Sequence, residues 1–178
     1  SDLSLMIRRE RLECSEYSRY LKWLEKQDKT AALEYWHKEL EGYSEYVTIP
    51  PYEVPEPTAL QMETFTASLR EEVRQKLLTL SRGNRITLGT VLQTAWGLLL
   101  QYYHNGKDVV FGKVVSGRNA RISGIETMVG LFANTIPVRV CVHEHETLLQ
   151  VLKEQQQKAV EGENYAYLSL ADIQGRIG

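Results

Sequence analysis

The hydrophobic pattern predicts two helices in the first part of the chain. Between residues 17 and 24, aromatic and aliphatic side chains recur at steps of three and four, which is typical of one face of a helix. Asp28 can cap a second helix, whose apolar positions continue to Leu40. Gly42 follows and is expected to end it. Residues 1 to 49 are therefore interpreted as an N-terminal helical segment.

Prolines separate this segment from the rest of the chain. Four of the five prolines lie between residues 50 and 57. Proline fixes φ and removes a backbone donor, so this stretch cannot sustain a helix or a central strand. We interpret residues 50 to 61 as an extended connector.

Residues 62 to 178 alternate between two hydrophobic patterns. Period-two or continuous apolar runs predict strands, whereas spacing by three and four predicts helices. The predicted strands cover residues 62 to 69, 109 to 115 (buried on both faces) and 136 to 142. The predicted helices cover residues 71 to 80, stopped by Gly83-Asn84, then 88 to 103, between a Thr87 cap and an Asn105-Gly106 turn, and 147 to 161. The alternation predicts an α/β fold, a two-layer sandwich of a mixed β-sheet with packed helices.

Composition excludes several classes of protein without choosing a function. The 178 residues carry 21 Lys+Arg and 23 Asp+Glu, a net charge of −2, and 43% are hydrophobic. These values are ordinary for a globular protein and give no electrostatic reason to expect nucleic acid or an anionic membrane. No apolar run reaches the length of a membrane span, and no secretory leader is recognised, so a cytoplasmic setting is expected. Cys14 and Cys141 are interpreted as two reduced thiols rather than one long-range disulfide.

The usual catalytic constellations are weak. His143 and His145 would share one face of a strand, but no third histidine lies nearby, so a solvated strand end is favoured over a metal site. Nucleophile-elbow, Walker and dinucleotide fingerprints are absent from the sequence. The informative region is instead the glycine-bearing loop 116–134 between two predicted strands. Gly117 and Gly130 bracket it, where a positive φ or a close backbone approach is expected.

The run Val129-Gly130-Leu131-Phe132-Ala133-Asn134-Thr135-Ile136-Pro137-Val138-Arg139 spans the end of this loop and the start of the next predicted strand. It resembles, almost residue for residue, a late core motif of the condensation domains of nonribosomal peptide synthetases. Ser116-Gly117-Arg118 and Gly124-Ile125-Glu126 also fit. An earlier, tyrosine-rich motif is echoed by residues 17 to 23, with Arg19 in place of the family's acidic residue. The resemblance extends from Tyr17 to Gln174.

The resemblance implies a fold and a division of labour. Condensation domains are two-lobed relatives of chloramphenicol acetyltransferase, and this chain resembles the second, acceptor-side lobe. The intact domain would form an amide bond between donor and acceptor aminoacyl or peptidyl thioesters held on carrier proteins. The family's His-His-x-x-x-Asp-Gly motif belongs to the first lobe and is absent here, so no catalytic residue is assigned in this chain and the chain alone is expected to be inactive.

The resemblance also implies partners and a candidate site. The expected partners are carrier proteins, the missing N-terminal lobe and a neighbouring adenylation domain. The domain is expected to bind no cofactor or metal, because phosphopantetheine belongs to the carriers. The residues expected to line the tunnel or to lie near the substrate are Ser116, Gly117, Arg118, Glu126, Gly130, Phe132 and Asn134.

Alternatives remain for single residues and for the whole chain. Asn134 could orient a substrate carbonyl or, the favoured interpretation, close the loop by a hydrogen bond. Arg118 could meet a carrier phosphate, but a clamp through Glu126 is favoured. Phe132 and the cluster around Tyr17 are expected to be packing residues. The chain as a whole could instead be a non-catalytic docking module, whereas an epimerization domain is disfavoured by Asn134-Thr135-Ile136-Pro137.

Overall fold

A computed structural model describes residues 16–49 and 64–177, with the side chains of 176 and 177 left aside. The predicted connector, Cys14 and the first two positions of the predicted strand 62–69 lie outside the described residues. The chain forms two compact units, each assembled from separated segments. Unit 1 comprises Ser1–Glu41, Gly112–Pro137 and Gly162–Gly178, and unit 2 comprises Gly42–Phe111 and Val138–Glu161.

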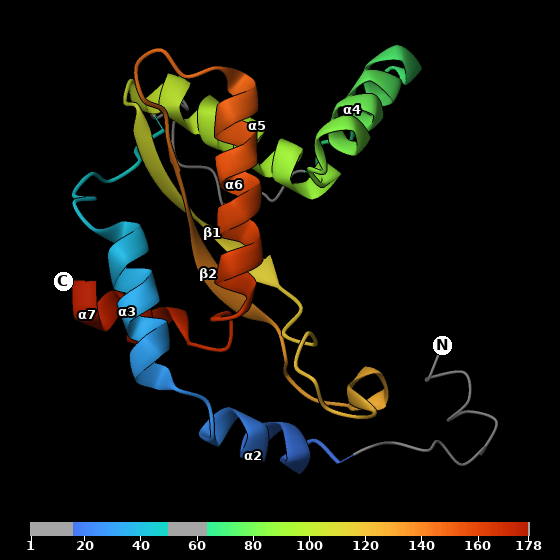
Figure 1. Ribbon diagram of the computed structural model, residues 1–178, viewed down its shortest axis with the longest axis vertical. Coiled ribbons are helices and arrows are strands. Elements are labelled where there is room, and N and C mark those ends of the chain that lie inside the picture. The colour runs from blue at the N-terminus through green and yellow to red at the C-terminus, as the bar shows by residue number, and fades with distance from the viewer. Residues whose placement is uncertain (1–15, 50–63, 178) are drawn as a thin grey trace, which may run out of the picture. The chain divides into compact units, whose positions relative to one another are not determined.

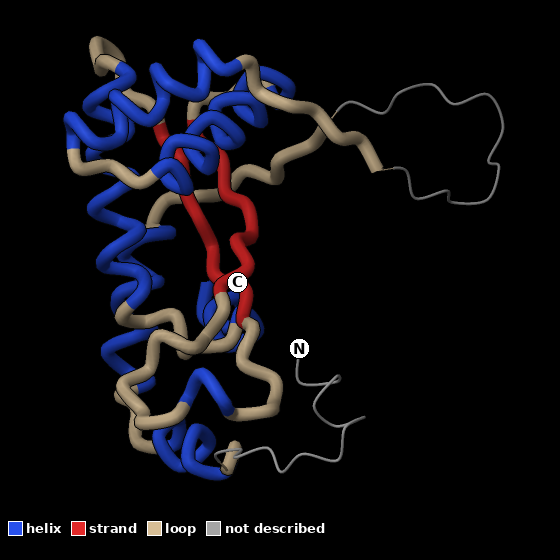
Figure 2. The backbone as a smooth tube through the Cα atoms, turned by 90° about the vertical axis from the view of Figure 1, so that its right-hand side faces the viewer, coloured by secondary structure: helices blue, strands red, loops and turns tan. Residues whose placement is uncertain are grey.

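The strands of the structure form one small sheet. β1 (Asp108–Val115) and β2 (Asn134–Cys141) pair side by side as antiparallel neighbours (Figure 2). The predicted α/β class is confirmed, but within the described ranges the sheet has these two antiparallel strands and is not mixed. The strand predicted at 62–69 is wrong for residues 64–69, which have no regular structure and leave Phe65 92% exposed. A strand needs a paired neighbour, and the described residues supply none there.

Burial along β1 also differs from the prediction of a strand buried on both faces. Val109 is 0% exposed, whereas Val114 is 73% exposed. The apolar sequence of β1 therefore corresponds to buried side chains only at the inner end of the strand, near Val109. The outer end leads into the loop 116–134.

Unit 1 contains α2 (Ser18–Glu25), α3 (Lys29–Leu40), the short 3₁₀ helix η1 (Ile125–Thr127) and α7 (Leu170–Ile177) (Figure 1). The predicted cap of α3 is confirmed, because Asp28 Oδ1 accepts from the backbone N of Ala31 at 3.0 Å. Helix α7 packs against α3 and was not predicted. Its signal was Ser169-x-x-Asp172, since Ser169 Oγ accepts from the Asp172 backbone N at 3.1 Å.

Unit 2 contains α4 (Glu71–Asn84), α5 (Leu88–His104) and most of α6 (Leu148–Glu163). The Thr87 cap of α5 is confirmed by its Oγ1, which accepts from Thr90 N at 3.0 Å. The predicted stop of α4 is wrong by a few residues: the helix continues through Gly83-Asn84 and ends at Arg85, whose φ is 57°. Asn84 stays helical because its Nδ2 donates to the Leu80 carbonyl at 2.9 Å.

The core of unit 2 joins α5 to the inner halves of the strands. Leu100 packs with Val109, Val138 and Val140. Gly97 allows this approach, since a Cβ there would lie 2.5 Å from Val140 Cγ2. In a second cluster, Ile86, which lies between α4 and α5, packs with Val91 of α5 and Leu152 of α6. Leu77 and Leu80 of α4 pack against this cluster.

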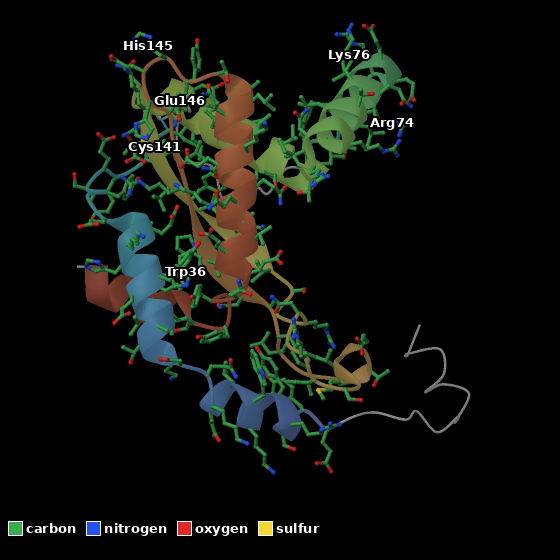
Figure 3. All side chains as sticks on the ribbon, viewed as in Figure 1. Trp36, Arg74, Lys76, Cys141, His145 and Glu146 are labelled. Atoms are coloured by element: carbon green, nitrogen blue, oxygen red, sulfur yellow. The ribbon has the colours of Figure 1, made fainter. Side chains whose placement is uncertain are left out.

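The histidine pair lies in a turn and not on one strand face. β2 ends at Cys141, and His145 has a φ of 71° (Figure 3). The Glu146 carboxylate accepts from the backbone N of His143 at 2.7 Å and closes this turn. In the part of the chain that the structure describes, no group of three or more potential metal ligands forms. No helix there is long and apolar enough to cross a membrane.

Candidate functional site

The loop 116–134 is held in place by two close glycine contacts within unit 1. Gly117 has a φ of 66°, and a Cβ there would lie 1.9 Å from the carbonyl oxygen of Phe132. The structure thus places both a positive φ and a close approach at Gly117. At Gly130 it places only the close approach, because a Cβ there would lie 2.2 Å from Cδ2 of Tyr17. Each end of the loop requires glycine for a different contact.

Phe132 is the centre on which the two family-like motifs meet. It is 4% exposed and lies in edge contact with Tyr17, with ring centroids 5.1 Å apart. The ring of Tyr20 is 4.7 Å from it, and the Arg118 guanidinium lies 4.1 Å from the ring centroid. The Tyr17 hydroxyl also donates to the Leu131 carbonyl at 2.5 Å. The packing roles expected for Phe132 and the tyrosine cluster are what the structure shows.

Arg118 clamps the loop, but through different partners from those expected. Its Nη2 donates to the Met128 carbonyl at 3.0 Å, and its Nη1 donates to the Ile125 carbonyl. The clamp through Glu126 is therefore wrong, since Glu126 faces solvent. The side chains of Ile125 and Met128 are buried, and their carbonyls need a donor that a guanidinium can supply.

Asn134 ties the start of β2 to the segment that follows α6. Its Nδ2 donates to the carbonyls of Ala166 at 2.8 Å and Leu168 at 2.7 Å. Its Oδ1 accepts from the backbone N of Thr135 at 2.9 Å. These bonds occupy both donors of the amide, so the favoured interpretation as a loop-closing residue matches the geometry.

An open pocket of about 270 Å³ lies beside the outer end of β1, within unit 1. Of the expected site residues, Ser116 and Gly117 line it, whereas Arg118, Glu126, Gly130, Phe132 and Asn134 do not. The remaining wall comes from Lys113, Val114, Val115, Asn119, Glu163 and Ala166.

The wall at 163–166 was missed by sequence reasoning because it is remote in sequence from the part of the loop that it faces: Asn119 and Glu163 are 44 residues apart. Asn119 Nδ2 donates to the Glu163 carbonyl at 3.2 Å, and Asn134 holds Ala166. The two asparagines therefore position this wall. The only signal in the sequence was that the loop contains two asparagines, whose side-chain amides can bond to a neighbouring segment.

The electrostatics of this region suit packing and positioning. Burial raises the pKa of Tyr20, and the neighbouring Tyr17 raises it further, so the phenol stays neutral. The pocket lining contains one ammonium, Lys113, one carboxylate, Glu163, and no histidine. The arrangement can shape and orient a bound group, and Lys113 and Glu163 each present one ionisable side chain to it.

Comparison with solved structures defines the fold. The chain superposes on the first condensation domain of the calcium-dependent antibiotic synthetase with a TM-score of 0.73, over 98% of this chain and 41% of that one, at 16% identity. A four-domain nonribosomal peptide synthetase bound to AMP and glycine gives a TM-score of 0.70, over 83% of this chain and 11% of that one, at 21% identity. The fold is that of condensation domains, which belong to the chloramphenicol acetyltransferase-like fold.

The amino-acid sequence shows the family. The family described as "Condensation domain" matches residues 8–178, and the chain belongs to it. Bacitracin synthase 3 of Bacillus licheniformis is 43% identical over 158 residues, and tyrocidine synthase 2 of Brevibacillus parabrevis is 44% identical over 158 residues. These matches cover 89% of this chain but only 2% and 4% of the two synthases.

Proposed function

We propose that this chain is the acceptor-side lobe of a condensation domain that forms the amide bond between two carrier-bound thioesters. The observation that supports this most directly is the convergence of the two family motifs on Phe132. Segments that are remote in sequence, each similar to the family, thereby pack around one loop. The first residues of this loop border an open pocket.

In the proposed reaction, the α-amine of the acceptor attacks the carbonyl carbon of the donor thioester. A C–N bond forms, the C–S bond breaks, the donor carrier's thiol leaves and the amine loses a proton. Catalysis then depends on positioning two reactants and on stabilising the developing oxyanion. The proposed contribution of this chain is a rigid tunnel wall, in which Gly117, Arg118 and Asn134 hold the loop backbone in place.

The chemistry beyond positioning would come from polypeptide other than this chain. The sequence has no His-His-x-x-x-Asp-Gly motif, so the first lobe would supply it. The carriers would bring their own phosphopantetheine arms, and an adenylation domain would load the acceptor. The composition favours a cytoplasmic setting for this assembly.

Complementation in trans tests the proposal. The chain is mixed with the first lobe of the bacitracin synthase 3 condensation domain and with two loaded carriers, and dipeptidyl product is followed by mass spectrometry. We expect product from the mixture and none from this chain alone. The control is the same first lobe with both histidines of its motif replaced by alanine, which should give no product. Carrier binding without product in the complete mixture would overturn the proposal in favour of a docking module, and turnover by the isolated chain would overturn the division of labour.

A further inference from the structure

A second open pocket, of about 360 Å³, lies between the end of α4 and one face of α6, within unit 2. Its volume falls at the lower end of the range of about 300–1,000 Å³ that is typical of small-molecule sites. Residues 84 to 86 line it on the α4 side. On the α6 side it is lined by residues at helical spacing, namely Lys153, Gln156, Gln157, Val160 and Glu161.

The side-chain amide of Gln156 is held in one orientation by two donors. Its Oε1 accepts from the backbone N of Thr87 at 2.8 Å and from Thr90 Oγ1 at 2.9 Å. A backbone N–H can only donate, so the atom that meets Thr87 has to be the amide oxygen. The Nε2 of Gln156 therefore keeps both of its N–H donors, and residues 16–49 and 64–177 supply no acceptor for them.

Two cationic side chains line the same pocket without a carboxylate partner. Arg85 and Lys153 are exposed, and neither forms an ion pair within the part of the chain that the structure describes. The one carboxylate of the lining, Glu161, accepts from Gln157 Nε2 at 2.8 Å. It follows Lys153 by eight residues of α6, which is about 12 Å of helix rise. The pocket thus offers more positive charge and N–H donors than its own carboxylate can use.

The backbone of Arg85 is in a conformation that favours glycine. Its φ of 57° and ψ of 39° lie in the left-handed region, where a side chain is strained. The conformation is set by the end of α4, because the Arg85 backbone N donates to the Ser81 carbonyl. The Arg85 side chain is exposed, so core packing gives no reason for it. Residues held in such strained conformations cluster at functional sites, which points to a role for this guanidinium at the pocket.

We propose that this pocket binds a small phosphate monoester, whose phosphate is held by Arg85, Lys153 and the Gln156 amide. A phosphate dianion matches two cations, and its terminal oxygens can accept from a guanidinium fork, an ammonium and an amide together. A carboxylate has a single charge and two oxygens, and would leave part of this donor set unused. Val160, which is 58% exposed, provides apolar surface for the organic part of the ester. The inference goes beyond the proposed function, since these residues have no part in the proposed amide-bond formation.

Titration of the ¹⁵N-labelled 178-residue chain, followed by NMR, tests the site. The probe is phenyl phosphate at about pH 7.5, where a phosphate monoester carries close to two negative charges. We expect saturable shifts of the Gln156 side-chain amide and of the Arg85 backbone N–H. The absence of saturable shifts at these groups would overturn the proposal.

Two further probes test the class of ligand. Benzoate keeps the ring and replaces the phosphate by a carboxylate, whereas inorganic phosphate lacks the ring. We expect both to bind several-fold more weakly than phenyl phosphate. Equally tight binding of benzoate would overturn the choice of a phosphate, and equally tight binding of inorganic phosphate would overturn the choice of an ester.

Variants separate recognition from folding. Arg85→Gly should raise the melting temperature, because it relieves the left-handed strain, and should weaken phenyl phosphate binding by about tenfold or more. Gln156→Glu keeps an oxygen for Thr87 but replaces the amide donors by a negative oxygen, and should abolish binding. Arg82→Gln is the control, since it removes one charge at an exposed position of α4 outside the pocket, and Kd should change by less than about twofold.

The control decides between recognition and a general charge effect. Equal losses of affinity in Arg82→Gln and Arg85→Gly would overturn the proposal, because they would show that only the net charge matters. Unchanged binding in Arg85→Gly or in Gln156→Glu would overturn it as well. Because Arg85→Gly is expected to be more stable than the native chain, its loss of binding would not be explained by unfolding.

Discussion

The side-chain amide of Asn134 lies 2.7 Å from the carbonyl oxygen of Leu168, and this bond connects the start of β2 to the segment after α6. The same nitrogen reaches Ala166 at 2.8 Å, so one side chain satisfies two backbone acceptors. Because Ala166 lines the pocket, the placement of the pocket wall depends on a residue that does not itself line it.

Replacing Asn134 should therefore cost more stability than replacing a neighbouring asparagine. Asn134→Ala leaves two carbonyls without their donor and should lower the free energy of unfolding by about 1–3 kcal/mol. Asn134→Asp should lower it at least as much, because a carboxylate cannot donate and would face two carbonyl oxygens. Urea unfolding of the 178-residue chain measures both. Asn119→Ala is the control. It removes a single hydrogen bond, which is more exposed to solvent, and should lower the free energy of unfolding by less. Equal losses of stability at the two positions would show that the second hydrogen bond of Asn134 adds nothing to the free energy of unfolding.

Arg118 should not be replaceable by lysine. Its guanidinium reaches two carbonyls and also covers the Phe132 ring at 4.1 Å. Lysine carries one compact charge and cannot reproduce the planar fork, so Arg118→Lys should lower the free energy of unfolding by about 1.5–3 kcal/mol. Thermal unfolding followed by circular dichroism provides the measurement. Arg121→Lys, at an exposed position of the same loop, should leave the melting temperature unchanged. A lysine variant at 118 as stable as the native chain would contradict the clamp.

Two glycines with positive φ separate backbone strain from collision. Gly117→Ala combines left-handed strain with a Cβ 1.9 Å from the Phe132 carbonyl oxygen, whereas a Cβ at Gly42 (φ 73°) would meet no atom within 4 Å. Gly42→Ala should cost the strain alone, about 1–2 kcal/mol. Gly117→Ala should cost clearly more, as measured by chemical denaturation. Similar losses would mean that the loop moves away from Phe132 without penalty.

Replacing two helical glycines by alanine should change the stability of the chain in opposite directions. At Gly97 a Cβ would lie 2.5 Å from Val140 Cγ2, whereas at Gly83 it would meet no atom within 4 Å. Gly97→Ala should destabilise the chain by about 1–3 kcal/mol through overpacking. The higher helix propensity of alanine offsets only a small part of this loss. Gly83→Ala should stabilise it by about 0.5 kcal/mol, since alanine loses less backbone entropy in a helix. Differential scanning calorimetry of both variants gives the two signs, and a stabilised Gly97→Ala variant would refute the close approach.

Much of the local structure could be predicted because it depends on neighbours in sequence. The caps at Asp28 and Thr87 were recognisable, since a side chain three residues from a free backbone NH satisfies it locally. The end of α4 was misplaced for a similar local reason: Asn84 can bond back to Leu80, and its helical state is not visible from the Gly-Asn pair alone. The strand at 64–69 was wrong because pairing needs a partner that alternation does not specify.

The candidate site likewise has features that the sequence alone predicts and features that depend on the tertiary structure. The sequence alone determined the family-like motifs, the glycines at the ends of the loop and the aromatic residues that form its core. Only the tertiary structure decided that Arg118 binds the Ile125 and Met128 carbonyls and not Glu126, and that Glu163 and Ala166 complete the pocket. Backbone carbonyls are present at every residue and carry no sequence signal, so which of them meets a given donor depends on how the chain returns in space.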